Sequence, residues 1–234
     1  MDMKKVSSGH TSIKPTNIPL DLLDGWKNQN IPLRQRVLAD QAIQEAHKNQ
    51  PNILFTIVQD FLRKGNFTQD SSILETGCST GYYYEVLSIL FQTKLKYTGV
   101  DYSEAMIQKA KEYYSTANFI VADGANLPFS DNEFDFVILG SILIHVSNAL
   151  QHISEATRVS KQYVILHRSI ACKSKPTQYL KKLAYEVPVF EIHYNENELL
   201  EMFKLNKLEL VDKVEYVVDV KNDEYHASYL FKKV

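Results

Sequence analysis

Two glycines bracket three small residues in the segment Gly77-Cys78-Ser79-Thr80-Gly81, which follows an apolar run and precedes a helical pattern. At a strand-to-helix turn, glycine permits a positive φ and lets a ligand approach the backbone without a Cβ in the way. The segment is not the dinucleotide fingerprint G-x-G-x-x-G, because Ser79 stands where that pattern needs glycine, and no Gly-Lys-Ser/Thr follows to make a phosphate loop. A ligand-binding loop is therefore predicted, with an ordinary glycine-capped turn as the alternative.

The carboxylate of Glu75 lies immediately before this loop. A negative charge here would repel a phosphate but would suit a cationic amino group or its bound water. The sequence therefore favours a nucleotide that carries an amino acid.

Asp101 ends the second β-prone run, KYTGVD, 26 positions beyond Glu75. At the end of a strand next to the first loop, a carboxylate can accept hydrogen bonds from both hydroxyls of a ribose. A helix cap ahead of Ser103 is the alternative role.

The third run, NFIVAD, ends at Asp123 and is followed by Gly124. This pair would border the same crevice and contact an adenine ring, unless Asp123 is a simple turn residue.

The elements that must position these residues follow from the hydrophobic pattern. Short β-prone runs alternate with helical stretches from about residue 70 to 168, which is typical of an α/β fold with a mostly parallel sheet. Residues 208–234 read as an antiparallel hairpin without a helix. Apolar spacing over residues 22–64 predicts an N-terminal helical extension, preceded by a polar leader that we expect to be loosely attached.

We therefore divide the chain into residues 1–65, a flexible leader with a helical extension, and residues 66–234, a ligand-binding domain. The second part includes an insertion around residues 171–205, which contains a predicted helix at its end. The chain has 234 residues with 44% hydrophobic content, enough to bury a substantial core.

Composition excludes several function classes. The formal net charge is -2, so no overall positive field attracts nucleic acid, and the stretch Lys173 to Lys182 is interpreted as a solvated face. No apolar run reaches the roughly 18 residues of a transmembrane helix, and the polar N-terminus does not resemble a secretory signal. The only cysteines, Cys78 and Cys172, have no metal-ligand spacing, so we expect no metal site. A cytoplasmic location is the default expectation.

Together the motifs resemble the class I S-adenosylmethionine-dependent methyltransferases. The matching segments, in family order, are ILETGCSTG (73–81), GVDYS (99–103), ADGANLPFSDNEFDFVI (122–138) and GSILIHV (140–146). The resemblance implies a Rossmann-like, seven-stranded sheet whose last strand is inserted antiparallel, with S-adenosylmethionine bound over the strand ends. It departs from the commonest first motif at Ser79, where glycine is usual.

The resemblance also assigns roles to individual positions. It places Glu75, Gly77 and Gly81 along the methionine part of the cofactor and includes Cys78 among the cofactor-binding residues. It places Asp101 at the ribose, Tyr102 at the adenine face, Asp123 and Gly124 at the adenine edge, and Gly140 near the sulfonium.

Catalytic residues are expected to be few, because methyl transfer from a sulfonium depends mainly on positioning. His145 is the candidate general base or acceptor contact, with a packed structural histidine as the alternative. From the insertion, the resemblance suggests Tyr185, Glu191, His193 and Tyr194 as acceptor-side residues, although a solvated loop histidine is favoured for His193. From the helical extension, Trp26, Arg34 and Gln35 are candidates for covering the cofactor, with an amphipathic helix that docks on the sheet as the alternative.

No Asn/Asp-Pro-Pro-Tyr/Phe motif follows the fourth strand, so a small-molecule or glycan hydroxyl is preferred over an exocyclic nitrogen. The leading hypothesis is therefore a methyltransferase that acts on such an acceptor at oxygen. A catalytically inactive S-adenosylmethionine-binding module that acts as a partner or sensor is the main alternative. A nicotinamide-dependent oxidoreductase is disfavoured by Ser79. The identity of the acceptor, the methylated atom and the oligomeric state are not encoded in a recognisable pattern.

Overall fold

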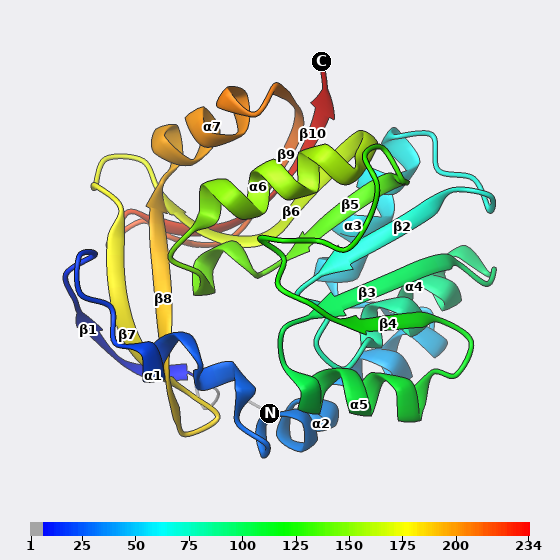
Figure 1. Cartoon of the computed structure of the whole chain (residues 1–234), viewed down its shortest axis with the longest axis horizontal. Helices are drawn as coiled ribbons and strands as arrows, with labels where there is room; N and C mark the ends of the chain where they lie inside the picture. The colour runs from blue at the N-terminus through cyan, green and yellow to red at the C-terminus, as the bar shows by residue number, and fades with distance from the viewer. Residues whose placement is uncertain (1–6) are drawn as a thin grey trace.

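The computed structural model describes residues 7–234, and its central feature is a curled sheet with helices on both faces (Figure 1). The strands are β1 (Ser7–Ser12), β2 (Ser72–Thr76), β3 (Lys96–Asp101), β4 (Asn118–Val121), β5 (Phe134–Gly140), β6 (Ser160–Cys172), β7 (Gln178–Ala184), β8 (Val187–Asn195), β9 (Leu208–Asp219) and β10 (Glu224–Lys233). The α-helices are α1 (Leu20–Leu23), α2 (Ile31–His47), α3 (Ile53–Lys64), α4 (Tyr82–Phe91), α5 (Glu104–Tyr113), α6 (Ala149–Val159) and α7 (Glu196–Leu205). Two short 3₁₀ helices are η2 (Gly25–Lys27) and η3 (Leu143–His145).

The predicted parallel sheet is confirmed. Strands β4, β3, β2, β5 and β6 lie side by side and are parallel, and β10 pairs antiparallel with both β6 and β9. The last strand is thus inserted between β6 and β9, as the family resemblance implied. This order brings the carboxyl ends of β2, β3 and β5 to one edge, where open α/β sheets bind ligands.

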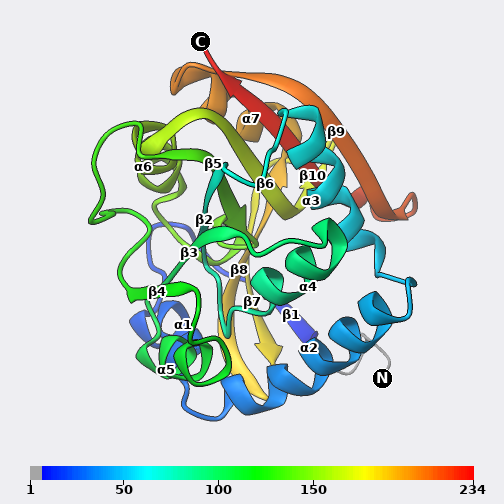
Figure 2. The same cartoon turned by 90° about the vertical axis from the view of Figure 1, so that its right-hand side faces the viewer.

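The sheet has ten strands rather than the expected seven. The additional strands are β8, which joins the far end of β6 in parallel at Ala171 and Cys172, and β7 and β1, which continue antiparallel from β8. Figure 2 shows these three strands extending below the main sheet, on the side where α2 lies. Most of the insertion around residues 171–205 is therefore a β-hairpin followed by α7.

The leader is a further difference from expectation. Residues 7–12 were expected to be loosely attached, but they form β1, which is hydrogen-bonded to β7, and the backbone N–H of Ile13 also donates to Tyr179 O at 2.8 Å. The edge of β7 supplies unpaired backbone groups, so a polar segment without an apolar pattern can still be held there. Residues 1–6 of the predicted leader lie outside the described residues.

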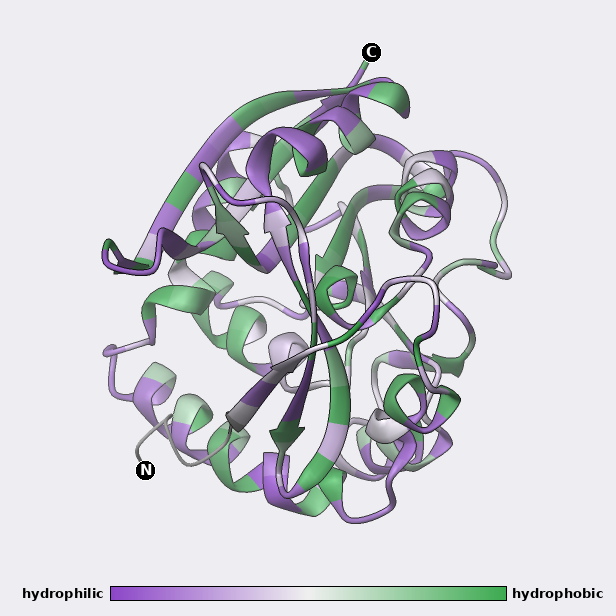
Figure 3. Ribbon diagram, turned by 90° about the vertical axis from the view of Figure 1, so that its left-hand side faces the viewer, coloured by the Kyte–Doolittle hydropathy of each residue, from purple (hydrophilic) through white to green (hydrophobic). Residues whose placement is uncertain are grey.

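The helical extension forms as predicted over residues 22–64. In α3, the buried residues Phe55, Val58, Phe61 and Leu62 recur at helical spacing, and the Asn52 side chain caps the helix by accepting from Leu54 N at 3.0 Å. Figure 3 shows hydrophobic and hydrophilic residues alternating along the ribbon of the helices and strands. Within the described part of the chain, no helix combines the length and hydrophobicity of a membrane span.

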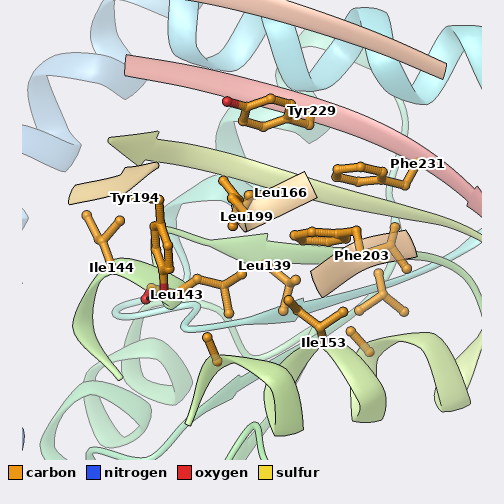
Figure 4. Close-up of a cluster of buried hydrophobic side chains, with 14 of the residues drawn as sticks. Leu139, Leu143, Ile144, Ile153, Leu166, Tyr194, Leu199, Phe203, Tyr229 and Phe231 are labelled. Carbon is orange, nitrogen blue, oxygen red and sulfur yellow. Dashed lines mark hydrogen bonds between the residues drawn. The ribbon is translucent and has the colours of Figure 1, made fainter. Parts of the chain in front are cut away.

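The hydrophobic core has two parts, one on each face of the sheet. One part lies between the sheet and helices α6 and α7, where the rings of Phe203 and Phe231 stack with centroids 4.0 Å apart (Figure 4). The other lies under α3, α4 and α5 and contains Phe61, Leu87 and Ile107. These packed faces hold the strand ends rigidly and so fix the positions of the loops that follow them.

Candidate active site

The loop between β2 and α4 adopts the tight turn that its glycines predict. Gly77 and Gly81 have φ angles of +75° and +77°, which favour glycine, and Ser79 between them has a φ of +53°. The backbone N–H groups of Gly77 and Cys78 donate to Val100 O at 2.8 and 3.0 Å. These bonds hold the loop against the end of β3, next to the predicted ribose site.

Asp101 connects two loops in the position the sequence predicted. Its Oδ2 accepts from Ser79 N and its Oδ1 from Ser103 N, both at 2.9 Å. Burial raises the pKa of this carboxyl to about 6, opposed by hydrogen bonds from the backbone N–H groups of Ser103, Ser79 and Tyr102. The bond to Ser103 closes a local turn before α5, whose N-cap residue is Ser103 itself, so the alternative of Asp101 as the helix cap is not what forms. The bond to Ser79 ties Asp101 to the glycine loop of the neighbouring strand.

Glu75 is almost completely buried at the end of β2. The Tyr97 hydroxyl donates to its Oε2, and burial raises the pKa of Glu75 to about 8, with the Tyr97 hydrogen bond opposing the shift. A Cβ placed on Gly140 would lie 2.7 Å from Glu75 Oε1. The carboxylate therefore lies against the end of β5, and Gly140 is the residue that leaves room for it.

The predicted adenine residues lie on the neighbouring loops. The Tyr102 hydroxyl donates to Leu23 O at 2.9 Å, which links the second motif to the N-terminal extension. Asp123 is exposed and accepts from Ala125 N at 2.9 Å, while Gly124 is buried and a Cβ there would lie 2.7 Å from His152 Nδ1. Only a glycine fits this approach between the third loop and α6.

Several buried polar atoms around these loops have no hydrogen-bond partner within residues 7–234. They are Trp26 Nε1, Thr80 Oγ1, Ser103 Oγ, Ser141 Oγ and His152 Nδ1. Buried polar groups are nearly always paired in folded proteins, so unpaired atoms near these loops are open to partners from a bound ligand. Ser169 Oγ, Tyr216 Oη and Tyr225 Oη, on β6, β9 and β10, are unpaired as well within the same residues. The donor and acceptor set, together with the glycine cradle, fits the amino acid, ribose and adenine parts of S-adenosylmethionine.

His145 lies beyond β5, at the end of η3. Its Nδ1 donates to Phe190 O at 2.8 Å, and its ring centroid is 4.7 Å from that of Trp26. Burial lowers the pKa of His145 to about 4, assisted by the positive charge of Lys182. The imidazole is therefore neutral at physiological pH, with Nε2 as the nitrogen that can accept a hydrogen bond.

The four insertion residues suggested for the acceptor side have different surroundings. Tyr185 is in the turn between β7 and β8, with its ring centroid 6.4 Å from that of Trp26. Tyr194 is buried in the core and donates to Leu143 O at 2.7 Å. Glu191 and His193 belong to a separate buried polar cluster. The structure thus brings Tyr185 to the His145 side and gives Tyr194 a packing role.

Helix α2 contacts both the glycine loop and the inserted hairpin. Ser79 Oγ donates to Gln35 Oε1, and Arg34 donates to Tyr185 O and forms an ion pair with Glu186 at 2.8 Å. Gln35 therefore contacts the first motif, whereas Arg34 contacts the inserted hairpin. That these residues and Trp26 cover the cofactor stays a prediction.

Arg168 was missed by the sequence analysis. It has a φ of +63° where β6 and β10 change register, and its backbone N–H donates to Ser228 Oγ at 3.3 Å. Its positive charge lowers the pKa of both Glu75 and His145. The guanidinium thus influences the charge of both Glu75 and His145. Its place within the apolar run that forms β6 is the signal that could have revealed it.

Part of this chain is similar in sequence to known proteins. Residues 74–166 match the family described as a methyltransferase domain. A demethylmenaquinone methyltransferase of Staphylococcus epidermidis is 33% identical over 99 residues, which are 41% of this chain and 41% of that protein. The chain therefore matches less than half the length of this relative.

Two solved structures illustrate the likeness in fold. Magnesium protoporphyrin IX methyltransferase of Synechocystis with bound S-adenosylhomocysteine has a TM-score of 0.57 and 18% identity, over 83% of this chain and 86% of that one. The [4+2]-cyclase SpnF has a TM-score of 0.60 and 14% identity, over 76% of this chain and 81% of that one. Residues 74–166 thus match a methyltransferase domain in sequence, and the solved structures share its fold.

Proposed function

We propose that the chain transfers a methyl group from S-adenosylmethionine to a hydroxyl oxygen of a small-molecule or glycan-type acceptor. The observation that carries the proposal is the convergence of Glu75, the glycine loop and Asp101 at one strand edge, surrounded by unpaired buried polar atoms. The bound cofactor supplies an electrophilic methyl group on a sulfonium sulfur. The residues around the cofactor must bind it and position the acceptor.

The roles proposed for the binding residues follow from charge and position. Glu75 would bind the cationic amino group, which favours the ionised carboxylate that burial otherwise disfavours. The Asp101 carboxylate, which now accepts from the backbone N–H of Ser79, would accept hydrogen bonds from the ribose hydroxyls as well or instead. Tyr102 and Gly124 would border the adenine ring.

On the acceptor side, His145 is assigned a positioning contact rather than strong base catalysis. A pKa of about 4 makes the imidazole a weak proton acceptor at neutral pH, but neutral Nε2 can accept a hydrogen bond from an acceptor hydroxyl. The ring of Trp26 lies against this histidine and the ring of Tyr185 lies against Trp26, and this group of rings favours an acceptor with a ring of its own. The names of the quinone and porphyrin methyltransferases support a small organic acceptor of that kind.

The test of cofactor binding is calorimetric titration of S-adenosylmethionine and S-adenosylhomocysteine into the purified chain, with NADH as the comparison ligand. Asp101→Ala should weaken binding at least tenfold, about 1.4 kcal/mol. Asp60→Ala, an exposed position on α3, is the matched control and should bind normally. A folded wild-type protein that binds neither ligand would overturn the proposal.

Turnover separates an enzyme from a binding module that has lost activity. The structural likeness to a cyclase shows that this fold serves reactions other than methyl transfer. Quinols, porphyrins and glycans should therefore be incubated with the cofactor, and products with one added methyl group sought by mass spectrometry. Tight cofactor binding with no methylated product across the panel would favour the binding module.

A further inference from the structure

A buried polar cluster lies where β1, β8 and β10 come together, outside the cofactor-binding residues. Its centre is Glu191, whose side chain is 1% exposed. Glu191 Oε1 is 3.0 Å from His10 Nε2 and 3.1 Å from His193 Nε2. One ligand atom from each of these three residues lies within 4.8 Å of the others. Two imidazoles and one carboxylate thus converge on a single point.

The second oxygen of the same carboxylate has a different partner. Lys182 donates to Glu191 Oε2, which leaves Oε1 facing the two imidazoles. This ion pair with a partly buried lysine favours the ionised carboxylate, which is the form that binds a metal.

Glu224 fixes the orientation of the His193 ring. Its Oε1 is 3.3 Å from His193 Nδ1, and because a carboxylate only accepts, Nδ1 carries the proton. The unshared pair of Nε2 then faces Glu191 Oε1 at 3.1 Å, so two acceptors oppose each other unless a cation lies between them. That cation is either a proton, which makes His193 an imidazolium, or a metal ion.

The third ligand favours the metal. His10 Nε2 approaches the same oxygen from β1 at 3.0 Å, so a second imidazole nitrogen completes a set of three ligand atoms of the types that bind zinc. In a tetrahedral site with bonds of about 2.0 Å, ligand atoms are separated by roughly 3.3 Å, close to the two distances observed. A carboxylate on the far nitrogen of a ligating histidine is also the usual second partner in zinc sites.

We propose that His10, Glu191 and His193 form a binding site for a divalent transition metal, with zinc as the probe and Glu224 as the residue that orients His193. The bound ion would connect β1 to the inserted hairpin. His10 is the exposed ligand, so the fourth position of the ion faces solvent. Lys182 limits the affinity, because its positive charge lies next to the ion.

The test uses the full chain after dialysis against a chelator. Zn²⁺ titration followed by calorimetry should show one site, and Co²⁺ should give the visible absorption of a tetrahedral N/O environment. Thermal unfolding should shift upward in the presence of either ion, because the ligands are assembled only in the folded state.

Variants separate this site from adventitious binding. His10→Ala and His193→Ala should each weaken Zn²⁺ binding at least tenfold, whereas His47→Ala, an exposed histidine at the end of α2, should leave it unchanged. Lys182→Met should tighten binding. His10 is exposed on β1, so its variant remains informative even if the His193 variant fails to fold. The proposal is overturned if folded wild type binds no Zn²⁺, if His10→Ala binds like wild type, or if His193 NMR signals show an imidazolium that Zn²⁺ does not alter.

Discussion

The hydroxyl of Ser79 donates to the side-chain oxygen of Gln35, which joins the glycine loop of the methyltransferase domain to helix α2 of the N-terminal extension. Ser79 is also the position at which the first motif departs from the commonest family pattern, and its φ is +53°. The serine therefore combines a backbone strain that glycine would not have with a hydrogen bond that glycine could not make.

Two substitutions separate these effects. Ser79→Ala loses the hydrogen bond but keeps the left-handed backbone, and it should destabilise the protein by about 1 kcal/mol. Ser79→Gly loses the same bond but relieves a strain of about 1 kcal/mol, so its stability should stay close to wild type. Urea unfolding measures both values. Equal losses in the two variants would show that the left-handed conformation carries no cost.

Glu75 should make the ligand-free protein less stable as pH rises. Its pKa is near 4.5 when exposed and about 8 in the folded chain, so between these pH values the folded state binds more protons than the unfolded state. Stability is therefore lost through this window. Glu75→Gln removes the titrating group, keeps an acceptor for Tyr97, and should gain up to a few kcal/mol over wild type near pH 8. The measurement is urea unfolding across the window, with Asp60→Asn as the control. A constant difference at every pH would contradict the assignment.

His145 should contribute to acid destabilisation. Its folded pKa of about 4 lies below the ordinary value of 6.5, so the unfolded state binds more protons between these values, and stability falls as pH falls through them. His145→Gln should reduce that loss by at most about 3 kcal/mol. His167 and His226 also have lowered pKa values, so the informative quantity is the difference between variant and wild type. Denaturant unfolding at about pH 7 and about pH 5 provides it. Parallel losses in the two proteins would exclude His145 as a source.

Local pattern was sufficient to predict the parallel sheet and the glycine turn after β2. Buried parallel strands are continuous apolar runs, and the turn after β2 needs a positive φ at positions 77 and 81, where glycine stands. Both features therefore depend only on residues that are close in sequence. The C-terminal hairpin was predictable because β9 and β10 follow each other directly.

The remaining features depend on contacts between distant segments. Strand β1 has no apolar pattern and is held by the backbone of β7, so the sequence of residues 7–12 does not predict a strand. The cluster of His10 with Glu191 joins residues 181 positions apart. The alternation Glu191-x-His193 on one face of a strand was a visible signal, but the third ligand is supplied only by tertiary structure.

Gly140 provides the sharpest test of the methionine end of the site. A Cβ at this position would lie 2.7 Å from Glu75 Oε1, so Gly140→Ala should push the buried carboxylate away from the cofactor's amino group. Affinity for S-adenosylhomocysteine should fall at least tenfold, with an overpacking cost of about 1–3 kcal/mol in stability. Gly65→Ala is the matched control, because its Cβ would lie 2.4 Å from a Phe136 ring carbon, away from the ligand loops. That variant should lose stability and keep its affinity. Calorimetry measures the affinity of both variants, and urea unfolding measures their stability. Similar affinity losses in the two proteins would mean that general destabilisation, not the displacement of Glu75, weakens binding.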